Sequence, residues 1–258
     1  MHRAPTRREP RQSVLSSYVF NSPAPRQLGA VFLALVLLIL GGCVHPPAPT
    51  TPPVPDLADA KERVARYVDS GEYDRDFAAV VAQARTWLER RAKSGGRLAL
   101  VLDIDETALS NIPVLKLNDW GVILEGATNL ITGPCGLFEW MKLSRAEPLR
   151  PTLELTRLAR QSGVAILFVT ARPERLRAAT EQNLKAAGYE WARLFLKPPR
   201  PKGAPKPASE SEYKSRVRAQ CVAEGYTIIL NMGDQQSDLA GGFAERTFKL
   251  PNPFYRVP

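Results

Sequence analysis

The chain has 258 residues, a net charge of +9 at neutral pH and only two histidines, His2 and His45. Both histidines precede the first predicted helix. The folded part therefore cannot contain a serine–histidine–aspartate or cysteine–histidine catalytic group, a histidine phosphatase site or a zinc site with imidazole ligands. No stripe of lysine and arginine with interleaved aromatic residues is present, which argues against nucleic-acid binding, whereas a mild positive excess favours anionic small molecules.

The amino-terminal stretch has the pattern of an export signal. Five arginines against one acid occupy residues 1–27, an apolar run follows over residues 28–40, and Leu40-Gly-Gly-Cys43 ends it. This tetrad resembles the bacterial lipobox, whose cysteine is acylated. We expect residues 1–42 to be a lipoprotein signal peptide and Cys43 to be lipid-anchored in the bacterial cell envelope, at the outer membrane facing the periplasm or the surface. A plain signal peptide is the alternative, and the long basic region is compatible with a start codon downstream of Met1.

A linker and one domain are predicted to follow. Residues 43–56 form the linker, and six of the ten residues in 46–55 are proline, which favours an extended spacer of about 30 Å. The remainder, residues 57–258, is a natural length for a single domain. It contains Cys135 and Cys221, which either form one disulfide in an oxidising compartment or remain two buried thiols.

The first half of the domain is predicted to build one buried strand between helices and an irregular lobe. Apolar residues at three- and four-residue steps predict helices over residues 57–69 and 74–92, and the run at 98–102 predicts a strand that ends at Asp103. Residues 112–147 are too long and too irregular for a plain loop, so we expect an inserted lobe over the strand ends. Its aromatic residues pack this lobe, or one of them, Trp120 or Trp140, stacks on a substrate ring.

From Pro151 onwards, strands and helices alternate. Helices are predicted over residues 152–161, 173–187 and 209–224, strands over 164–169, 192–196 and 226–232, and a surface loop over 197–207. Alternating strands and helices predict a parallel α/β sheet with right-handed crossovers.

Acidic residues gather at the predicted strand ends. One strand runs into Asp103 and Asp105, a second into Thr170, and a third into Asp234 and Asp238. A parallel sheet brings these ends to one edge, where the carboxylates would repel one another unless they shared a cation. Oxygen ligands without histidine or cysteine favour Mg²⁺, and an aspartate beside Mg²⁺ can attack phosphorus.

A structural interpretation of the same residues is also available. Asp105 or Thr107 could merely cap a helix that starts near Ala108. That interpretation leaves Asp103 and Glu106 as unexplained charges at the end of a core strand, and we therefore favour a site.

These motifs resemble those of the haloacid dehalogenase (HAD) superfamily, in particular its class IIIB acid phosphatases, a group that includes bacterial lipoprotein phosphatases and plant vegetative storage proteins. The resemblance rests on Asp103-Ile-Asp-Glu-Thr107 with Leu109-Ser-Asn111, Val169-Thr-Ala-Arg172, Gly233-Asp-Gln-Gln-Ser-Asp-Leu239 and Leu250-Pro-Asn-Pro253. It implies a Rossmann-like parallel sheet flanked by helices, with N-terminal helices and a small cap lobe inserted at about residues 111–150.

The resemblance also implies a role for each site residue. Asp103 matches the nucleophile, Asp105 the general acid/base and Thr170 the hydroxyl that holds the phosphate. Lys214 matches the lysine of the third motif, with Lys197 as a rival and a solvated helix lysine as the alternative. The Mg²⁺ ligands it implies are the Asp103 carboxylate, the Asp105 backbone carbonyl, Asp234 and, in a supporting position, Asp238.

The function expected from these patterns is an exported, Mg²⁺-dependent acid phosphatase. It would hydrolyse phosphomonoesters through an aspartyl-phosphate, with broad specificity or a preference for nucleoside monophosphates. One alternative is a non-catalytic binding or storage-type protein on the same fold, although the retained Asp103 argues against it. Another is phosphotransfer to an alcohol acceptor through the same intermediate. The expected partners are a small phosphomonoester and, through Cys43, a membrane. The oligomeric state is left open.

Overall fold

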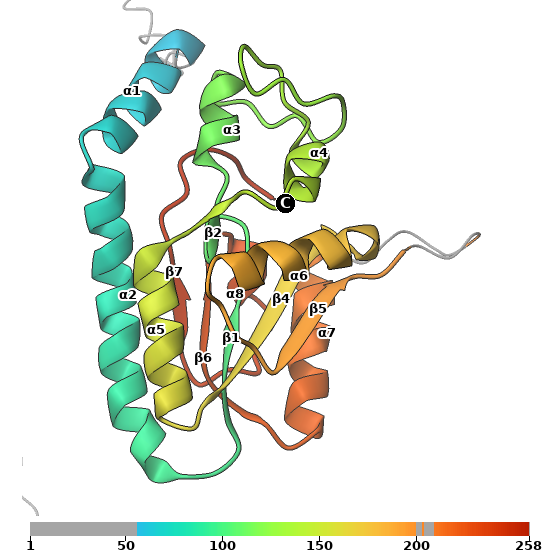
Figure 1. Cartoon of the computed structure of the whole chain (residues 1–258). Coiled ribbons are helices and arrows are strands. Elements are labelled where there is room, and N and C mark those ends of the chain that lie inside the picture. Colours follow the sequence, from blue (N-terminus) through green and yellow to red (C-terminus); the bar gives the residue numbers. More distant parts are fainter. Residues whose placement is uncertain (1–55, 200–202, 204–208, 258) are drawn as a thin grey trace, which may run out of the picture. The chain divides into compact units, whose positions relative to one another are not determined.

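The computed structural model describes residues 56–199, 203 and 209–257, which form one α/β unit (Figure 1). The predicted signal peptide, Cys43 and the predicted linker up to residue 55 lie outside these residues, as does most of the predicted surface loop at 197–207. Among the helices that are described, none combines the length and the apolar character that a membrane span requires.

The core of the unit is a parallel sheet in which the described residues contribute five strands, in the order β5-β4-β1-β6-β7. Central β1 pairs with β4 on one side and β6 on the other, so that Leu102 has Phe168 and Met232 as its register partners. Every residue of β1 is buried. The bounds are β1 Leu98–Leu102, β4 Ala165–Pro173, β5 Arg193–Lys197, β6 Thr227–Gly233 and β7 Thr247–Lys249.

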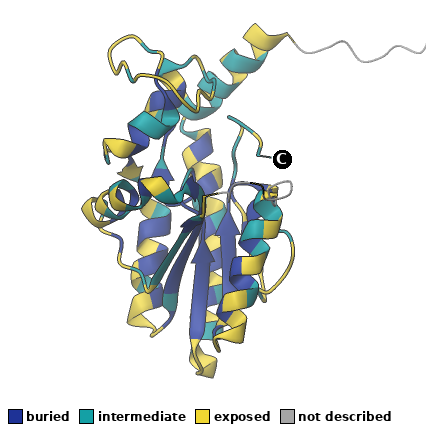
Figure 2. Cartoon of the chain, turned by 90° about the vertical axis from the view of Figure 1, so that its right-hand side faces the viewer, coloured by how far each residue is buried: buried dark blue, intermediate teal, exposed yellow. Residues whose placement is uncertain are grey.

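Helices cover both faces of this sheet, and Figure 2 shows the buried strands between them. On one face, Phe77 and Leu88 of α2 and Leu155 of α5 pack in a cluster that contains Leu100 and Leu102. On the other face, α7 packs against alternate residues of the same strands. The bounds are α1 Leu57–Asp69, α2 Glu72–Arg91, α5 Arg150–Gln161, α6 Arg177–Ala186, α7 Glu210–Ala223 and α8 Gln236–Leu239.

An inserted lobe separates β1 from α5, as the sequence predicts. It contains α3 (Ile112–Leu117) and α4 (Leu137–Lys142) and is joined to the sheet domain through a short antiparallel pair, β2 (Leu109–Ser110) with β3 (Glu147–Pro148). In Figure 1 it lies beyond the ends of the strands. Both tryptophans of the lobe have partners within the protein: Trp120 stacks on Phe254 near the C-terminal end of the domain, and the Trp140 indole donates to the Asn111 side chain.

Three details differ from the sequence predictions. The interpretation that a helix starts near Ala108 is wrong, because Leu109 belongs to a strand and pairs with Pro148. Strand β4 continues past Val169 to Pro173, so the predicted helix at 173–187 begins only at Arg177, after a 3₁₀ turn. Strand β7 was not predicted at all.

Cys135 and Cys221 are both buried and free. Cys135 lies in the lobe, where its backbone N–H donates to the Asn118 side chain at 2.7 Å, and Cys221 packs between α7 and the sheet. The structure therefore agrees with two buried thiols and not with a disulfide.

Candidate active site

The carboxyl ends of the three middle strands carry the predicted site residues. Asp103 follows β1 directly, and its backbone N–H donates to the Met232 carbonyl at 3.1 Å, which extends the ladder by one residue. Thr170 lies within β4, and Asp234 follows β6. The loop after Asp103 turns tightly because the backbone N–H groups of Ala108 and Leu109 both donate to the Ile104 carbonyl at 2.8 Å.

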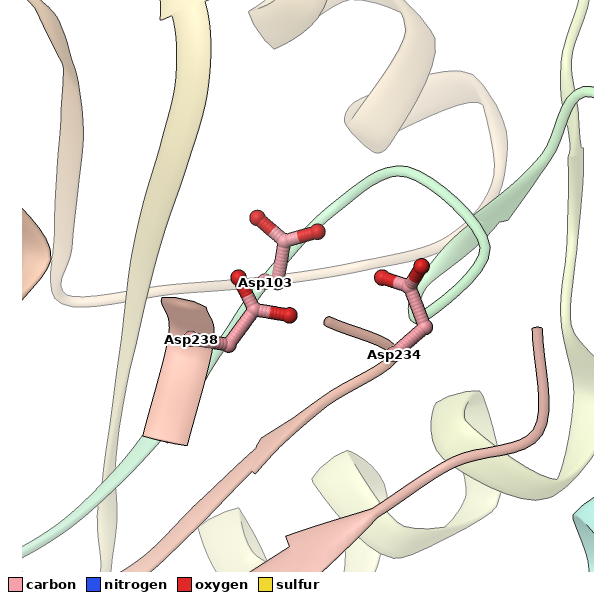
Figure 3. A group of neighbouring side chains, drawn as sticks. All are labelled: Asp103, Asp234 and Asp238. Carbon is pink, nitrogen blue, oxygen red and sulfur yellow. The ribbon is translucent and has the colours of Figure 1, made fainter. Parts of the chain in front are cut away.

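Three carboxylates meet at this edge of the sheet. Asp103, Asp234 and Asp238 each offer an oxygen, these oxygens lie within 4.8 Å of one another, and all three residues are buried (Figure 3). Asp238 comes from α8 and packs directly over Gly233, where a Cβ atom would lie 2.3 Å from an Asp238 carboxylate oxygen. Glycine at position 233 therefore permits the close approach of Asp238 to the cluster.

Lys214 of α7 supplies the positive charge next to this cluster. Its ammonium group, on a side chain that is almost fully buried, donates to Asp103 at 2.6 Å and to Asp238 at 2.5 Å. Lys197, the rival in the sequence analysis, forms an ion pair with Glu210 instead. Of the two lysines, Lys214 is therefore the one in contact with Asp103.

Asp105 points to a different cation. Arg172 donates to the Asp105 carboxylate from Nη2 at 2.7 Å and from Nε at 3.0 Å, and the Asn111 amide donates to it at 2.8 Å. Arg172 is buried and belongs to β4, two residues beyond Thr170. In the sequence, Arg172 stands in one of the family motifs, but the motif alone does not indicate its role. The sequence feature that could have indicated a site role for Arg172 is its position two residues after Thr170, a predicted site residue.

The two aspartates of the first motif consequently differ in their pKa values. Burial raises the pKa of Asp103, Lys214 offsets part of the rise, and the neighbouring acids Asp238 and Asp234 add to it, which leaves this pKa well above its usual range. Burial also acts on Asp105, but Arg172 outweighs it and lowers the Asp105 pKa below its ordinary value. Burial and Asp238 together raise the pKa of Asp234 to about 6.

The donor set fits a hard divalent cation. The cluster contains three buried carboxyl groups, and among the described residues Lys214 is the cation paired with them. One lysine does not balance the negative charge of three carboxylates. Carboxylate oxygens together with a backbone carbonyl are ligands that Mg²⁺ prefers. Asp103, Asp234 and the carbonyl of Asp105 are the groups that would hold it. Asp238 already accepts from Lys214 and, at 2.7 Å, from the Gln235 backbone N–H, which suits a supporting position.

Residues 250–257, here called the C-terminal strap, complete the site. The Asn252 amide donates to Asp234 at 2.6 Å, and the Tyr255 hydroxyl donates to Glu106. Phe254 stacks on Trp120 of the lobe, with ring centroids 5.6 Å apart. The strap therefore contacts Asp234, a candidate metal ligand, as well as Glu106 of the first motif and Trp120 of the lobe. From the sequence, only residues 250–253 of the strap were recognisable, as part of the family pattern.

A cavity of about 460 Å³ opens over these residues, between the sheet edge and the lobe. Its floor includes Asp103, Asp105, Thr170 and Lys214, while α4 and the lobe loop before it form one wall. Thr170 accepts from the Arg172 backbone N–H at 3.2 Å, which leaves its hydroxyl proton available to a ligand. The structure therefore brings all the predicted site residues of the domain into one cavity or its immediate lining.

The chain is similar to proteins of a known family. The model of the HAD superfamily, subfamily IIIB (acid phosphatase), matches residues 54–258. The stem 28 kDa glycoprotein of Glycine max is 36% identical over 200 residues, which cover 76% of this chain and 74% of the relative. Acid phosphatase 1 of Solanum lycopersicum is 35% identical over 164 residues, covering 63% of this chain and 60% of the relative. Vegetative storage protein 1 of Arabidopsis thaliana is 33% identical over 205 residues, covering 78% and 72%.

Solved structures show the same fold. The class C acid phosphatase from Bacillus anthracis superimposes with a TM-score of 0.57 at 22% identity, covering 76% of this chain and 86% of that one. The same class of phosphatase from Bacillus anthracis with tungstate bound gives a TM-score of 0.58 at 21% identity with the same coverage. The chain therefore belongs to subfamily IIIB of the HAD superfamily and is a phosphomonoesterase of the acid phosphatase type.

Proposed function

We propose that this chain hydrolyses phosphomonoesters through an aspartyl-phosphate formed on Asp103, with Mg²⁺ held by Asp103, Asp234 and the carbonyl of Asp105. The observation that carries the proposal is the meeting of three buried carboxylates within 4.8 Å, with Lys214 on Asp103. Mg²⁺ would offset the charge of the transferring phosphoryl group.

The side chains of the site supply the remaining steps. An Asp103 carboxylate oxygen attacks phosphorus, the bond to the leaving-group oxygen breaks, and Asp105 gives that oxygen a proton. Water then attacks the phosphorus of the aspartyl-phosphate, Asp105 takes the proton of this water, and the Asp103 carboxylate is released with inorganic phosphate. The Thr170 hydroxyl and the Lys214 ammonium group donate to the phosphate oxygens, and Arg172 holds Asp105 in place.

An Asp103→Asn variant tests the chemistry with p-nitrophenyl phosphate as substrate. We expect kcat to fall by about 10³-fold or more, because removal of a nucleophile costs several orders of magnitude. Asp119→Asn is the matched control, since Asp119 is an exposed acid of the lobe that pairs with Lys61, and it should keep normal activity. Unchanged hydrolysis in Asp103→Asn would show that the nucleophile is assigned wrongly.

The metal and the two alternative functions need separate measurements. Activity should disappear in EDTA and return on addition of Mg²⁺. If the intact protein shows no Mg²⁺-dependent activity from acidic to neutral pH, the non-catalytic storage-type alternative holds. If an added alcohol or nucleoside gains a phosphoester, the intermediate is transferred to acceptors as well as to water.

We also propose export and lipid anchoring at Cys43, which the sequence pattern of residues 28–43 supports. Labelled fatty acid should be incorporated into the intact protein and not into a Cys43→Ser variant. Incorporation that persists in Cys43→Ser, or that never occurs, contradicts the anchor. Cell fractionation then tests the outer membrane as the location.

A further inference from the structure

The wall of the active-site cavity that the lobe contributes is apolar. Its members are Val122 and Leu124 in the lobe loop and Leu137, Phe138 and Met141 on α4. Leu124 is 53% exposed and Val122 is 37% exposed, so both stand at the mouth of the cavity with much of their apolar surface in water. Exposed aliphatic side chains at the mouth of a binding cavity favour an apolar ligand.

The side of the cavity opposite the lobe wall is polar, and several of its groups already have partners. The Tyr255 hydroxyl donates to Glu106, and the Gln235 amide donates to Asp234 and accepts from the Val257 backbone N–H at 2.9 Å. Glu210 pairs with Lys197 through Oε1, whereas its Oε2 has no hydrogen-bond partner among the described residues, and Ser237 and Arg256 also line the cavity. A sugar placed along the lobe wall would lose water from its hydroxyls without meeting a polar side chain in that wall, which is costly.

The aromatic residue of the wall is partly covered. The Arg175 guanidinium lies 4.6 Å from the centroid of the Phe138 ring and so occupies one face of it. The exposed part of the wall near the mouth is therefore aliphatic, and Leu124 and Val122 offer contact surface to a chain and no ring on which a base could stack.

We propose that this apolar wall, defined by residues 122, 124, 137, 138 and 141, receives an aliphatic leaving group. The preferred substrates are then phosphomonoesters of apolar alcohols, with the phosphate at Asp103 and the chain along Leu124 and Met141. This inference rests on the proposed function of the same cavity. It predicts that kcat/KM rises about two- to fourfold for each methylene group buried against the wall.

The test compares ethyl, butyl, hexyl and octyl phosphate, below micelle-forming concentrations, with glycerol phosphate and a nucleoside monophosphate. We expect kcat/KM to rise along the alkyl series and to exceed that of both polar substrates from butyl phosphate onwards. A flat series, or a nucleoside monophosphate as the best substrate, overturns the inference while p-nitrophenyl phosphate hydrolysis still supports the proposed function.

Binding measurements keep the inference testable without turnover. Alkylphosphonates cannot be hydrolysed, and calorimetry should show that their dissociation constants in Mg²⁺ fall from ethyl- to octylphosphonate by a similar factor per methylene. Equal affinities along this series would overturn the inference. Absence of turnover with every ester, p-nitrophenyl phosphate included, would overturn the proposed function instead.

A pair of variants locates the effect on the wall. Leu124→Ser should lower the ratio of kcat/KM for octyl over ethyl phosphate by about fivefold, because it removes aliphatic contact surface at the mouth. Ile131→Ser is the matched control: Ile131 belongs to the same lobe and is 89% exposed but does not line the cavity. Equal ratios in Leu124→Ser and the unaltered protein, or an equal loss in Ile131→Ser, contradict the assignment.

Discussion

Asp103 and Asp105 are two residues apart, but their carboxylates contact different cationic side chains. Lys214 contacts Asp103, whereas Arg172 and Asn111 hold Asp105. Their pKa values move in opposite directions, upward for Asp103 and downward for Asp105. These directions are the reverse of those that the proposed ionised nucleophile and protonated general acid need, so the proposed mechanism requires a cation at Asp103 to favour its ionised carboxylate.

The raised pKa of Asp103 leads to a prediction on stability. Because the folded protein disfavours the ionised Asp103 carboxylate, the neutral Asp103→Asn variant should be more stable than the unaltered protein at neutral pH in EDTA, by about 1 kcal/mol or 2–4 °C in Tm. The same variant should lose most of the Tm increase that Mg²⁺ produces. Thermal unfolding with EDTA and with Mg²⁺ measures both effects. A variant less stable than the parent in EDTA would contradict the burial argument.

Asn252 leads to a prediction on metal affinity. Asn252→Ala removes the amide that donates to Asp234 at 2.6 Å, so Asp234 is less firmly oriented. We expect the Mg²⁺ concentration for half-maximal activity to rise about 10-fold, with a smaller change in kcat at saturating Mg²⁺. Direct Mn²⁺ binding, followed by electron paramagnetic resonance, should weaken in parallel. Asn129→Ala, in a lobe loop where Asn129 bonds to its own neighbours, should leave both unchanged.

Among the elements, the C-terminal strap has a testable contribution to stability. Phe254 packs between Trp120 of the lobe and Tyr73 of α2, with ring centroids at 5.6 and 5.4 Å. Phe254→Ala should lower the free energy of unfolding by roughly 1–3 kcal/mol, less than for a fully buried ring because Phe254 is only half-buried. Urea denaturation measures the change. Phe243→Ala, which removes an exposed ring, should stay within about 0.5 kcal/mol of the parent.

Sequence patterns predict elements well where an apolar run is long and its ends are marked. The five apolar residues of β1 and the acid after them predict the central strand with its bounds, and α1 also has the predicted bounds. Strand β7 has three residues, of which only Phe248 is buried, and so it has no period to detect. The turn after Asp103 was open to a helical interpretation, because only the pairing of Leu109 with Pro148 decides its shape.

The site was predictable to the extent that its residues end strands. Asp103, Asp234 and Thr170 could be brought together from the parallel topology alone. The roles of Arg172 and Asn252 could not, since which carboxylate a side chain contacts depends on how two segments approach in the folded chain. For the same reason, only the structure distinguishes Lys214 from Lys197.

For the whole molecule, the placement of the thiols gives a prediction. Cys135 is buried in the lobe, where its thiol donates to the Asn129 carbonyl at 2.9 Å, whereas Cys221 is buried between α7 and the sheet. A thiol reagent should therefore react with neither in the native protein and with both after denaturation in the absence of reductant. Denatured protein in which neither Cys135 nor Cys221 reacts until reductant is added would instead indicate a disulfide. A Cys43→Ser background removes the remaining thiol.

The C-terminal strap also bears on when the enzyme becomes competent during its synthesis. Asp103 leaves the ribosome long before Asp234, and the strap that holds Asp234 and covers Glu106 follows later still. Domains generally fold as units while the chain emerges from its amino-terminal side. A nascent polypeptide that contains Asp103 but not yet residues 250–257 therefore lacks the Asn252 contact to Asp234 and the Tyr255 contact to Glu106, and its site is incomplete.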